Sequence, residues 1–210
     1  MKQVLLNGRV MCMLLLLSMP LSSWALTIDG YDIPQTISAT SNTAELKLNG
    51  ASMRILYGII DTYIGQLYLE TPSTDPDKII EADEFKRMVY KIVLKRVSGR
   101  RIASAMYDAL QINVTKEEGI QLEERLQLLV NMFDSSLKKG EESYLEWVPK
   151  KGSRIVINGV VKGMIPGKDL YDAILKIWIG ENPVASKFKR QVLGLQDHEP
   201  TSFSHRKDLR

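Results

Sequence analysis

Residues 48–54, Leu-Asn-Gly-Ala-Ser-Met-Arg, and the apolar run at 63–70, Tyr-Ile-Gly-Gln-Leu-Tyr-Leu-Glu, decide the predicted fold of this chain. Alternation of side chains predicts strands at 44–48, 53–60 and 63–70, with tight turns at Asn49-Gly50 and Asp61-Thr62. Arg54 lies on a strand that is apolar on both faces. A permanent positive charge is costly there unless an anion or several acceptors contact it. The pattern therefore predicts that Arg54 has a partner.

The remaining pattern predicts an α+β fold. Helices are expected where apolar residues recur every three to four positions, and the capping box of Thr115 and Glu118 marks the start of one of them. Runs of strands and runs of helices are segregated, which favours an antiparallel sheet with helices on one face. The predicted strands are 85–94, 144–148, 154–157 and 160–165, and the predicted helices are 76–82, 99–110, 116–139, 168–179 and 185–192.

The first 25 residues are typical of a secretory signal peptide. Positive charges precede an apolar segment, and Ser23-Trp24-Ala25 places small residues at the cleavage positions. We expect cleavage near Ala25 and an exported, periplasmic or secreted protein. An uncleaved membrane anchor is the alternative, but the apolar stretch 10–21 is short for a span of about 20 residues. No stable membrane span is expected after cleavage. Residues 26–195 are then one domain, and 196–210 a polar, disordered tail.

Composition excludes several classes of function. The chain has 28 basic and 25 acidic residues, and loss of Lys2 and Arg9 with the signal peptide leaves a net charge of +1. Steering to nucleic acid is therefore not expected. The lone cysteine, Cys12, lies in the signal peptide, and both histidines, His198 and His205, lie in the tail. The domain therefore lacks the residues for a Ser-His-Asp triad, a Cys-His pair or a zinc site, and we expect no metal or cofactor.

Three blocks, taken in order, resemble the chalcone isomerase family. They are Leu-x-Gly-Ala-x-x-Arg at 48–54, Tyr68-Leu69-Glu70, and the final helices that contain residues 177–183 and 187–195. The resemblance covers residues 44 to 195. It implies an open-faced antiparallel sheet with a layer of helices on one face.

The resemblance also implies site residues. Members of the family that close a flavanone ring use an arginine, a threonine, a tyrosine and an asparagine, with one further hydroxyl. Here Arg54 matches the arginine, and Tyr63 takes the threonine position with Thr62 beside it. The other three positions fall on Ile102, Ala109 and Ile177. Loss of one positioned donor typically costs about 10²- to 10³-fold in rate, so flavanone formation and catalytic residues are not expected.

Relatives of this family that bind fatty acids hold a carboxylate with an arginine and a tyrosine. The resemblance thus implies a small apolar or amphipathic ligand with an acid or enol group, held by Arg54 and Tyr63. Three alternatives stay open: an intramolecular lyase acting on an enone, a non-catalytic interaction module that recruits a partner through its tail, and a structural Arg54 that contacts Asp61, Glu70 or carbonyl oxygens. The walls of the expected cavity are Ile102, Met106, Ala109 and Ile177.

Two further features have more than one interpretation. Gly65, in the middle of a predicted strand, indicates either a bulge or the close approach of another backbone or a ligand. Lys95-Arg96 and Arg100-Arg101 form a basic cluster. Solvated charge is the usual reason for such a cluster, and binding of a phosphate or a lipid headgroup is the alternative.

Overall fold

The computed structural model describes residues 26–40 and 44–195. The predicted signal peptide and the predicted tail lie outside these residues. The helices are α1 (Pro76–Glu81), α2 (Gly99–Gln111), α3 (Lys116–Met132), α4 (Lys168–Ile179) and α5 (Ser186–Val192). The strands are β1 (Leu26–Ile28), β2 (Tyr31–Ile33), β3 (Thr36–Ser38), β4 (Glu45–Leu56), β5 (Ile60–Leu69), β6 (Lys86–Ile92), β7 (Arg96–Ser98), β8 (Ser136–Lys138), β9 (Glu142–Val148), β10 (Gly152–Ile157) and β11 (Val160–Ile165).

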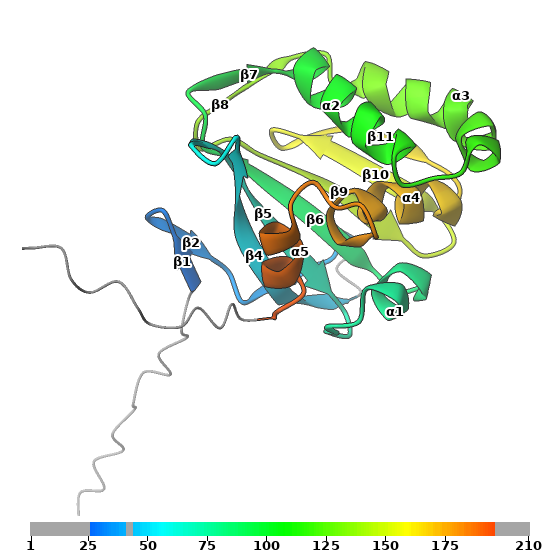
Figure 1. Cartoon of the computed structure of the whole chain (residues 1–210). Coiled ribbons are helices and arrows are strands. Elements are labelled where there is room, and N and C mark those ends of the chain that lie inside the picture. Colours follow the sequence, from blue (N-terminus) through cyan, green and yellow to red (C-terminus); the bar gives the residue numbers. More distant parts are fainter. Residues whose placement is uncertain (1–25, 41–43, 196–210) are drawn as a thin grey trace, which may run out of the picture.

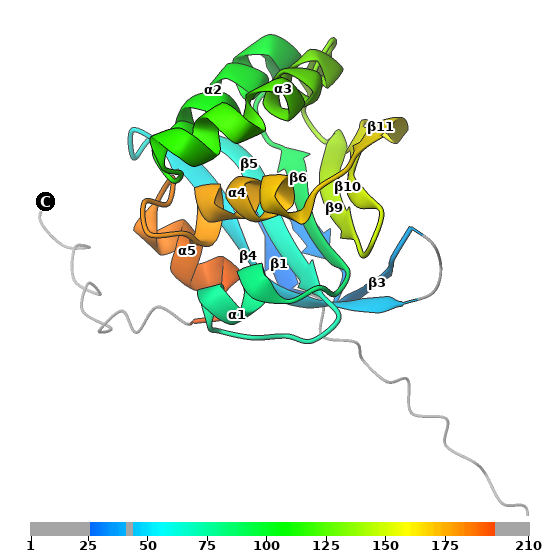
Figure 2. The ribbon, with the colours of Figure 1, turned by 90° about the vertical axis from the view of Figure 1, so that its right-hand side faces the viewer.

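The described part of the chain forms a curled antiparallel sheet of seven strands in the order β11-β10-β9-β6-β5-β4-β3 (Figure 1). The helices lie on one face of this sheet, and the β1–β2 hairpin lies on the other (Figure 2). This arrangement confirms the predicted α+β class with an antiparallel sheet and a helical layer. No helix in the described ranges is long and apolar enough to cross a membrane.

The first hairpin of the sheet differs from its prediction. Residues 45–56 form one strand of 12 residues, so the predicted turn at Asn49-Gly50 is wrong. The register with β5 shifts between Leu48 and Gly50, and Asn49 is the extra residue of a bulge. Its side chain donates to the carbonyl of Val192 and accepts from the N–H of Ser73, at 2.9 and 2.8 Å.

The turn between β4 and β5 is at Tyr57-Gly58. Both residues have positive φ, at 52° and 74°, the pattern of the two-residue turn that matches the twist of a hairpin. The predicted turn at Asp61-Thr62 is therefore also wrong, because both residues belong to β5. Asn or Asp is the usual first residue of such a turn, and a tyrosine there gives little signal in the sequence.

Helix α3 ends at Met132, before the predicted end at 139. The chain turns away there because Leu137 packs into the core from a strand and not from a continued helix. It is 2% exposed, and it lies in β8, opposite Val97 of β7. The capping box of Thr115 and Glu118 is confirmed, and so is the helix predicted at 168–179.

Helix α5 packs directly on the sheet at two glycines. A methyl group at Gly50 would lie 2.1 Å from the carbonyl oxygen of Gln191, and one at Gly65 would lie 2.3 Å from the ring of Phe188. Gly65 therefore accommodates a close approach, but not of the backbone or the ligand that the sequence suggested. The approaching group is an aromatic side chain of the protein itself.

Gly50→Ala should destabilise the fold because the added methyl group overlaps with backbone atoms of α5 that cannot move independently. We expect the free energy of unfolding to fall by about 1–3 kcal/mol, the usual cost of overpacking. Urea denaturation monitored by circular dichroism measures it.

Gly119→Ala is the matched control. Its methyl group would meet the flexible end of Gln111 at 3.1 Å and would make ordinary van der Waals contact with Val114 at 3.8 Å. Alanine is also favoured over glycine within a helix by up to about 1 kcal/mol. Equal loss of stability in both variants would show that the contact between α5 and β4 is not tight.

Candidate functional site

The pairing of β4 with β5 places Arg54 directly opposite Tyr63. In an antiparallel pair, opposite residues project from the same face of the sheet. This face is the one covered by helices, because Tyr63 packs against the main core cluster between the sheet and the helices. The structure thus brings together the two side chains that the sequence predicted as anchors.

Tyr63 is the centre of an aromatic cluster. The indole N–H of Trp178 in α4 donates to its hydroxyl oxygen at 3.0 Å. The rings of Tyr90 in β6 and Phe188 in α5 meet the Tyr63 ring edge-on, with centroids 5.6 and 6.0 Å away. Burial raises the pKa of Tyr63 to about 12, although the Trp178 hydrogen bond and the charge of Arg54 act in the opposite direction. The phenol therefore keeps its proton at any physiological pH.

Arg54 is half-buried and has few partners. Its guanidinium donates to the carbonyl oxygen of Ile55, and Thr62 donates its hydroxyl proton to the carbonyl of Arg54 at 2.7 Å. Within residues 26–40 and 44–195, Arg54 forms no ion pair. The carboxylate of Glu70, one partner considered from the sequence, instead accepts from the N–H of Phe85 at 2.6 Å. Most of the N–H donors of Arg54 therefore remain available.

The apolar residues predicted as cavity walls join the same core as Tyr63. Ile102, Met106 and Ala109 lie on α2, and Ile177 lies on α4. Ile177 and Met106 are buried, and the other two are partly buried. None of these four side chains carries a hydrogen-bonding group, so neither helix supplies a donor at those positions.

Three aromatic residues of the site were not predicted as site residues: Tyr90, Trp178 and Phe188. The hydroxyl of Tyr90 is buried without a hydrogen-bond partner among the described residues, which is uncommon for a polar group. Trp178 was expected only as a helix residue facing the core. The one sequence signal for Phe188 was Gly65, which leaves the space that its ring fills.

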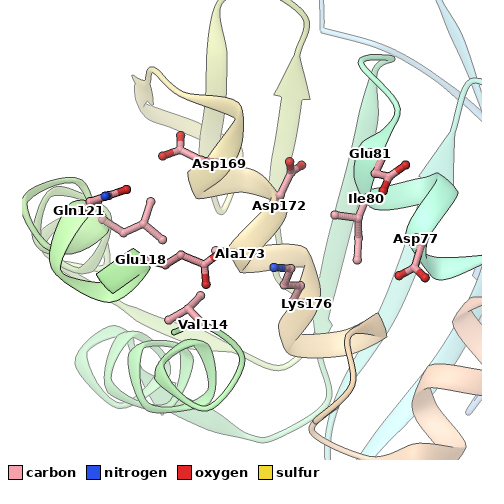
Figure 3. Close-up of a pocket in the computed structure, with 11 residues that line it drawn as sticks. Asp77, Ile80, Glu81, Val114, Glu118, Gln121, Asp169, Asp172, Ala173 and Lys176 are labelled. Carbon is pink, nitrogen blue, oxygen red and sulfur yellow. The ribbon is translucent and has the colours of Figure 1, made fainter. Parts of the chain in front are cut away.

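A pocket away from Arg54 and Tyr63 lies between α1, α3 and α4 (Figure 3). It has a volume of about 510 Å³, and its lining includes five carboxylates and one cation, Lys176. Burial raises the pKa of Asp172, and the Arg125 hydrogen bond lowers that of Asp169. Asp169 pairs with Arg125 and Asp172 pairs with Lys168, so the remaining negative charge is that of the other three carboxylates, and it opposes an acidic ligand at this place. The carboxylates are Asp77, Glu81, Glu118, Asp169 and Asp172.

A second pocket, of about 270 Å³, lies between α1 and β6 and has Lys86 in its wall. The ammonium of this buried lysine donates to the carbonyls of Ile79 and Ile80, at 2.7 and 2.9 Å. Neither pocket is lined by Arg54 or Tyr63. The described residues contain no group of His, Cys, Asp and Glu side chains suited to a metal ion.

Lys86 should make stability depend on pH. Burial lowers its pKa from 10.5 to about 8, and the charge of Lys168 acts in the same direction. Between these two pH values the unfolded chain binds more protons than the native protein, so the free energy of unfolding rises with pH. Wild type should gain up to about 3 kcal/mol over Lys86→Met in this window.

Urea denaturation of both proteins at pH 7, 8, 9 and 10 measures this difference in the free energy of unfolding. The buried tyrosines are the same in both proteins, so their titration cancels in the difference. Lys47→Met, at an exposed position, is the control and should give a curve parallel to that of wild type. Parallel curves for Lys86→Met would contradict the prediction.

Comparison with known proteins places this geometry in a family. The family model described as chalcone isomerase-like matches residues 25–194. Among solved structures, the fatty-acid binding protein of Arabidopsis thaliana superposes with a TM-score of 0.66 at 19% identity, over 80% of this chain and 95% of that chain. Among curated protein sequences, none matches this chain. Because the family model spans nearly all of the described residues and the solved structure has the same fold, the chain belongs to the chalcone isomerase-like family.

Proposed function

We propose that this protein binds a small apolar molecule with an acidic group, such as a fatty acid, and that Arg54 and Tyr63 contact the acidic group. The observation that carries the proposal is the state of Arg54. It is half-buried on the helix-covered face of the sheet and has no carboxylate partner within the described residues. The fatty-acid binding protein of the same fold adds support from outside the chain.

The two anchors are suited to an anion for different reasons. Arginine keeps its charge at all physiological pH values and can donate two parallel hydrogen bonds to a carboxylate. Tyr63 accepts from Trp178, so its own proton is free to be donated. With a pKa of about 12, it acts as a neutral donor and not as a competing anion.

The apolar part of the ligand would lie between α5 and the sheet. Phe188 fills this space, so binding requires its ring to move away from Gly65. Helix α5 has only seven residues, and a shift of so short an element is a small rearrangement. A buried alkyl chain would contribute about 0.8 kcal/mol per methylene and the charge-assisted hydrogen bond about 1.5–3 kcal/mol.

The intramolecular lyase alternative has weaker support. The positions matched to a tyrosine, an asparagine and a further hydroxyl carry Ile102, Ala109 and Ile177, which pack as core residues. The remaining pair, Arg54 and Tyr63, provides donors that can bind an anion. It provides no base at neutral pH, because the phenol stays protonated.

Arg54→Ala should weaken binding of a fluorescent fatty acid about 10- to 100-fold, the equivalent of one lost charge-assisted hydrogen bond. Fluorescence titration of the purified protein measures the dissociation constant. Native mass spectrometry of freshly purified wild type and variant shows whether a ligand is retained. Lys47→Ala removes an exposed charge from the same strand and should bind as wild type does.

The methyl ester of the same fatty acid is the decisive comparison. It has no negative charge, so Arg54→Ala should weaken its binding much less than it weakens that of the acid. Equal losses for acid and ester would mean that Arg54 supports the fold and does not anchor the ligand. Absence of fatty-acid binding by wild type, in titration and in native mass spectra, would reject the proposed function.

We further propose that the protein is exported after cleavage near Ala25. The support is the residue pattern of positions 1–25. The intact mass of the protein from the extracytoplasmic fraction should match a chain beginning at Leu26. Ala25→Arg should prevent cleavage, because the position before the cut requires a small residue. A full-length mass in that fraction for wild type would contradict cleavage.

A further inference from the structure

The tip of the β4–β5 hairpin is unusually apolar for a surface. Tyr57 is 85% exposed and Ile59 is 84% exposed, and their apolar neighbours in the hairpin are 36–41% exposed. Single exposed apolar residues are normal, but a contiguous group on a protruding loop marks an interaction site. We call this group the apolar tip; its members are Ile55, Leu56, Tyr57, Ile59 and Ile60.

A group of positive charges surrounds the paired strands β7 and β8 and the start of α2. All six side chains are exposed, and none of them forms an ion pair within the described ranges. Among the acidic residues nearby, Glu142 and Asp134 already pair with Lys91 and Lys162, so Asp61 and Glu141 offset only part of these six positive charges. We call this group the basic cluster; its members are Lys95, Arg96, Arg100, Arg101, Lys138 and Lys139.

Backbone hydrogen bonds place the two groups next to each other. The N–H groups of Val93 and Leu94 both donate to the carbonyl of Thr62, at 3.0 and 3.3 Å. The segment that leads into Lys95 therefore borders the base of the apolar tip. The N–H of Lys139 donates to the carbonyl of Lys95, which joins the two halves of the basic cluster. Figure 1 shows the β4–β5 turn and the β7–β8 strand pair at the same end of the molecule.

Both groups depart from what local stability favours. Arg100 and Arg101 lie in the first turn of α2, where the helix dipole favours negative charge, and no acidic residue is present there. Tyr57 takes a left-handed conformation that asparagine or glycine adopts at lower cost. Residues that destabilise the local structure without a compensating contact are expected at functional sites.

We propose that this end of the protein binds to the surface of a membrane that contains anionic lipids. The apolar tip would insert between the headgroups, where a tyrosine ring is well suited to the interface, and the basic cluster would contact the anionic headgroups. A convex apolar loop with flanking cations complements this surface better than it complements a nucleic acid, which offers no apolar face to isoleucine. Membrane binding goes beyond the proposed ligand binding and uses neither Arg54 nor Tyr63.

Co-sedimentation of the mature protein with vesicles tests this proposal. Binding to phosphatidylglycerol mixed with phosphatidylcholine should be at least about tenfold tighter than to phosphatidylcholine alone, and it should weaken with added salt. Lys95→Gln/Arg96→Gln should reduce binding to the anionic vesicles by about tenfold or more. Lys150→Gln/Lys151→Gln removes the same charge from the β9–β10 turn at the opposite end of the sheet and should have little effect.

The apolar tip can be tested without loss of the fold. Tyr57→Asn introduces the Asn-Gly pair preferred in this turn, and Ile59→Thr keeps a β-branched residue, so the double variant should fold at least as well as wild type. It should nevertheless lose most of its vesicle binding. Ile120→Ser removes an apolar side chain that is 69% exposed on α3 and should bind as wild type does.

Several outcomes would overturn the proposal. These are no sedimentation with anionic vesicles, binding equal to that on phosphatidylcholine alone, or binding that the tip and cluster variants leave unchanged. A mature protein that sediments as a dimer, becomes monomeric in Tyr57→Asn/Ile59→Thr and does not bind vesicles would assign this surface to a second copy of the chain instead. Fatty-acid titration tests the two proposals separately. The cluster variant and the tip variant should both bind the fluorescent fatty acid as wild type does.

Discussion

The contact of α5 with β4 and β5 is the constraint on which the geometry of the candidate site depends. Gly50 and Gly65 have no side chains, so the backbone of α5 and the ring of Phe188 reach the sheet itself. Ser52 and Gln191 add a side-chain hydrogen bond of 2.5 Å across this contact. With Phe188 in place, the Tyr63 ring meets neighbouring rings edge-on, an arrangement that contributes about 0.5–1.5 kcal/mol per pair. Movement of α5 therefore changes the packing around the site directly.

Arg54 differs from the two buried cations of the sheet in how its charge is compensated. Arg87 contacts the fully buried carboxylate of Glu146 and lies 4.2 Å over an aromatic ring, so removal of either partner of the ion pair would leave a costly unpaired charge. Lys86 donates to two carbonyls of α1, and burial still lowers its pKa. Both cations are explained by the fold. Arg54 has one backbone carbonyl as its acceptor, which satisfies a small part of a guanidinium.

The sequence predicted those features of the fold that depend on local patterns. Helix α4 and the capping box of α3 follow from periodicity and caps, and the fold class follows from the order of strands and helices. The turn predicted at Asn49-Gly50 was wrong because the same two residues suit both a turn and a bulge. The choice depended on α5, whose carbonyls Asn49 and Gly50 meet about 140 residues later. The predicted end of α3 was wrong because a tertiary contact of Leu137 overrode the helical periodicity of the sequence.

The candidate site divides in the same way. Arg54 and Tyr63 lie on adjacent strands of one hairpin, and a short register error would still have left them close together. Phe188 and Trp178 come from helices more than 100 residues away, and only the packed structure shows that they meet Tyr63. Residue type gives no signal for Tyr90, because tyrosine is common in strands. Only the structure shows that its hydroxyl is buried without a hydrogen-bond partner among the described residues.

Several departures from local stability lie at one end of the sheet, although Lys150 in the β9–β10 turn at the other end also has a positive φ, of 63°. Tyr57, Arg54 and the two arginines that begin α2 all lie at the first of these ends, whereas the unusual charges further along the sheet have partners. Arg54 is separated from the Tyr57-Gly58 turn by only Ile55 and Leu56. If both proposals hold, a tip inserted into a bilayer would bring Arg54 close to the depth at which the carboxylates of membrane-borne fatty acids lie. A ligand would then enter from the membrane side, and the acidic pocket beside α1 would play no part in its capture.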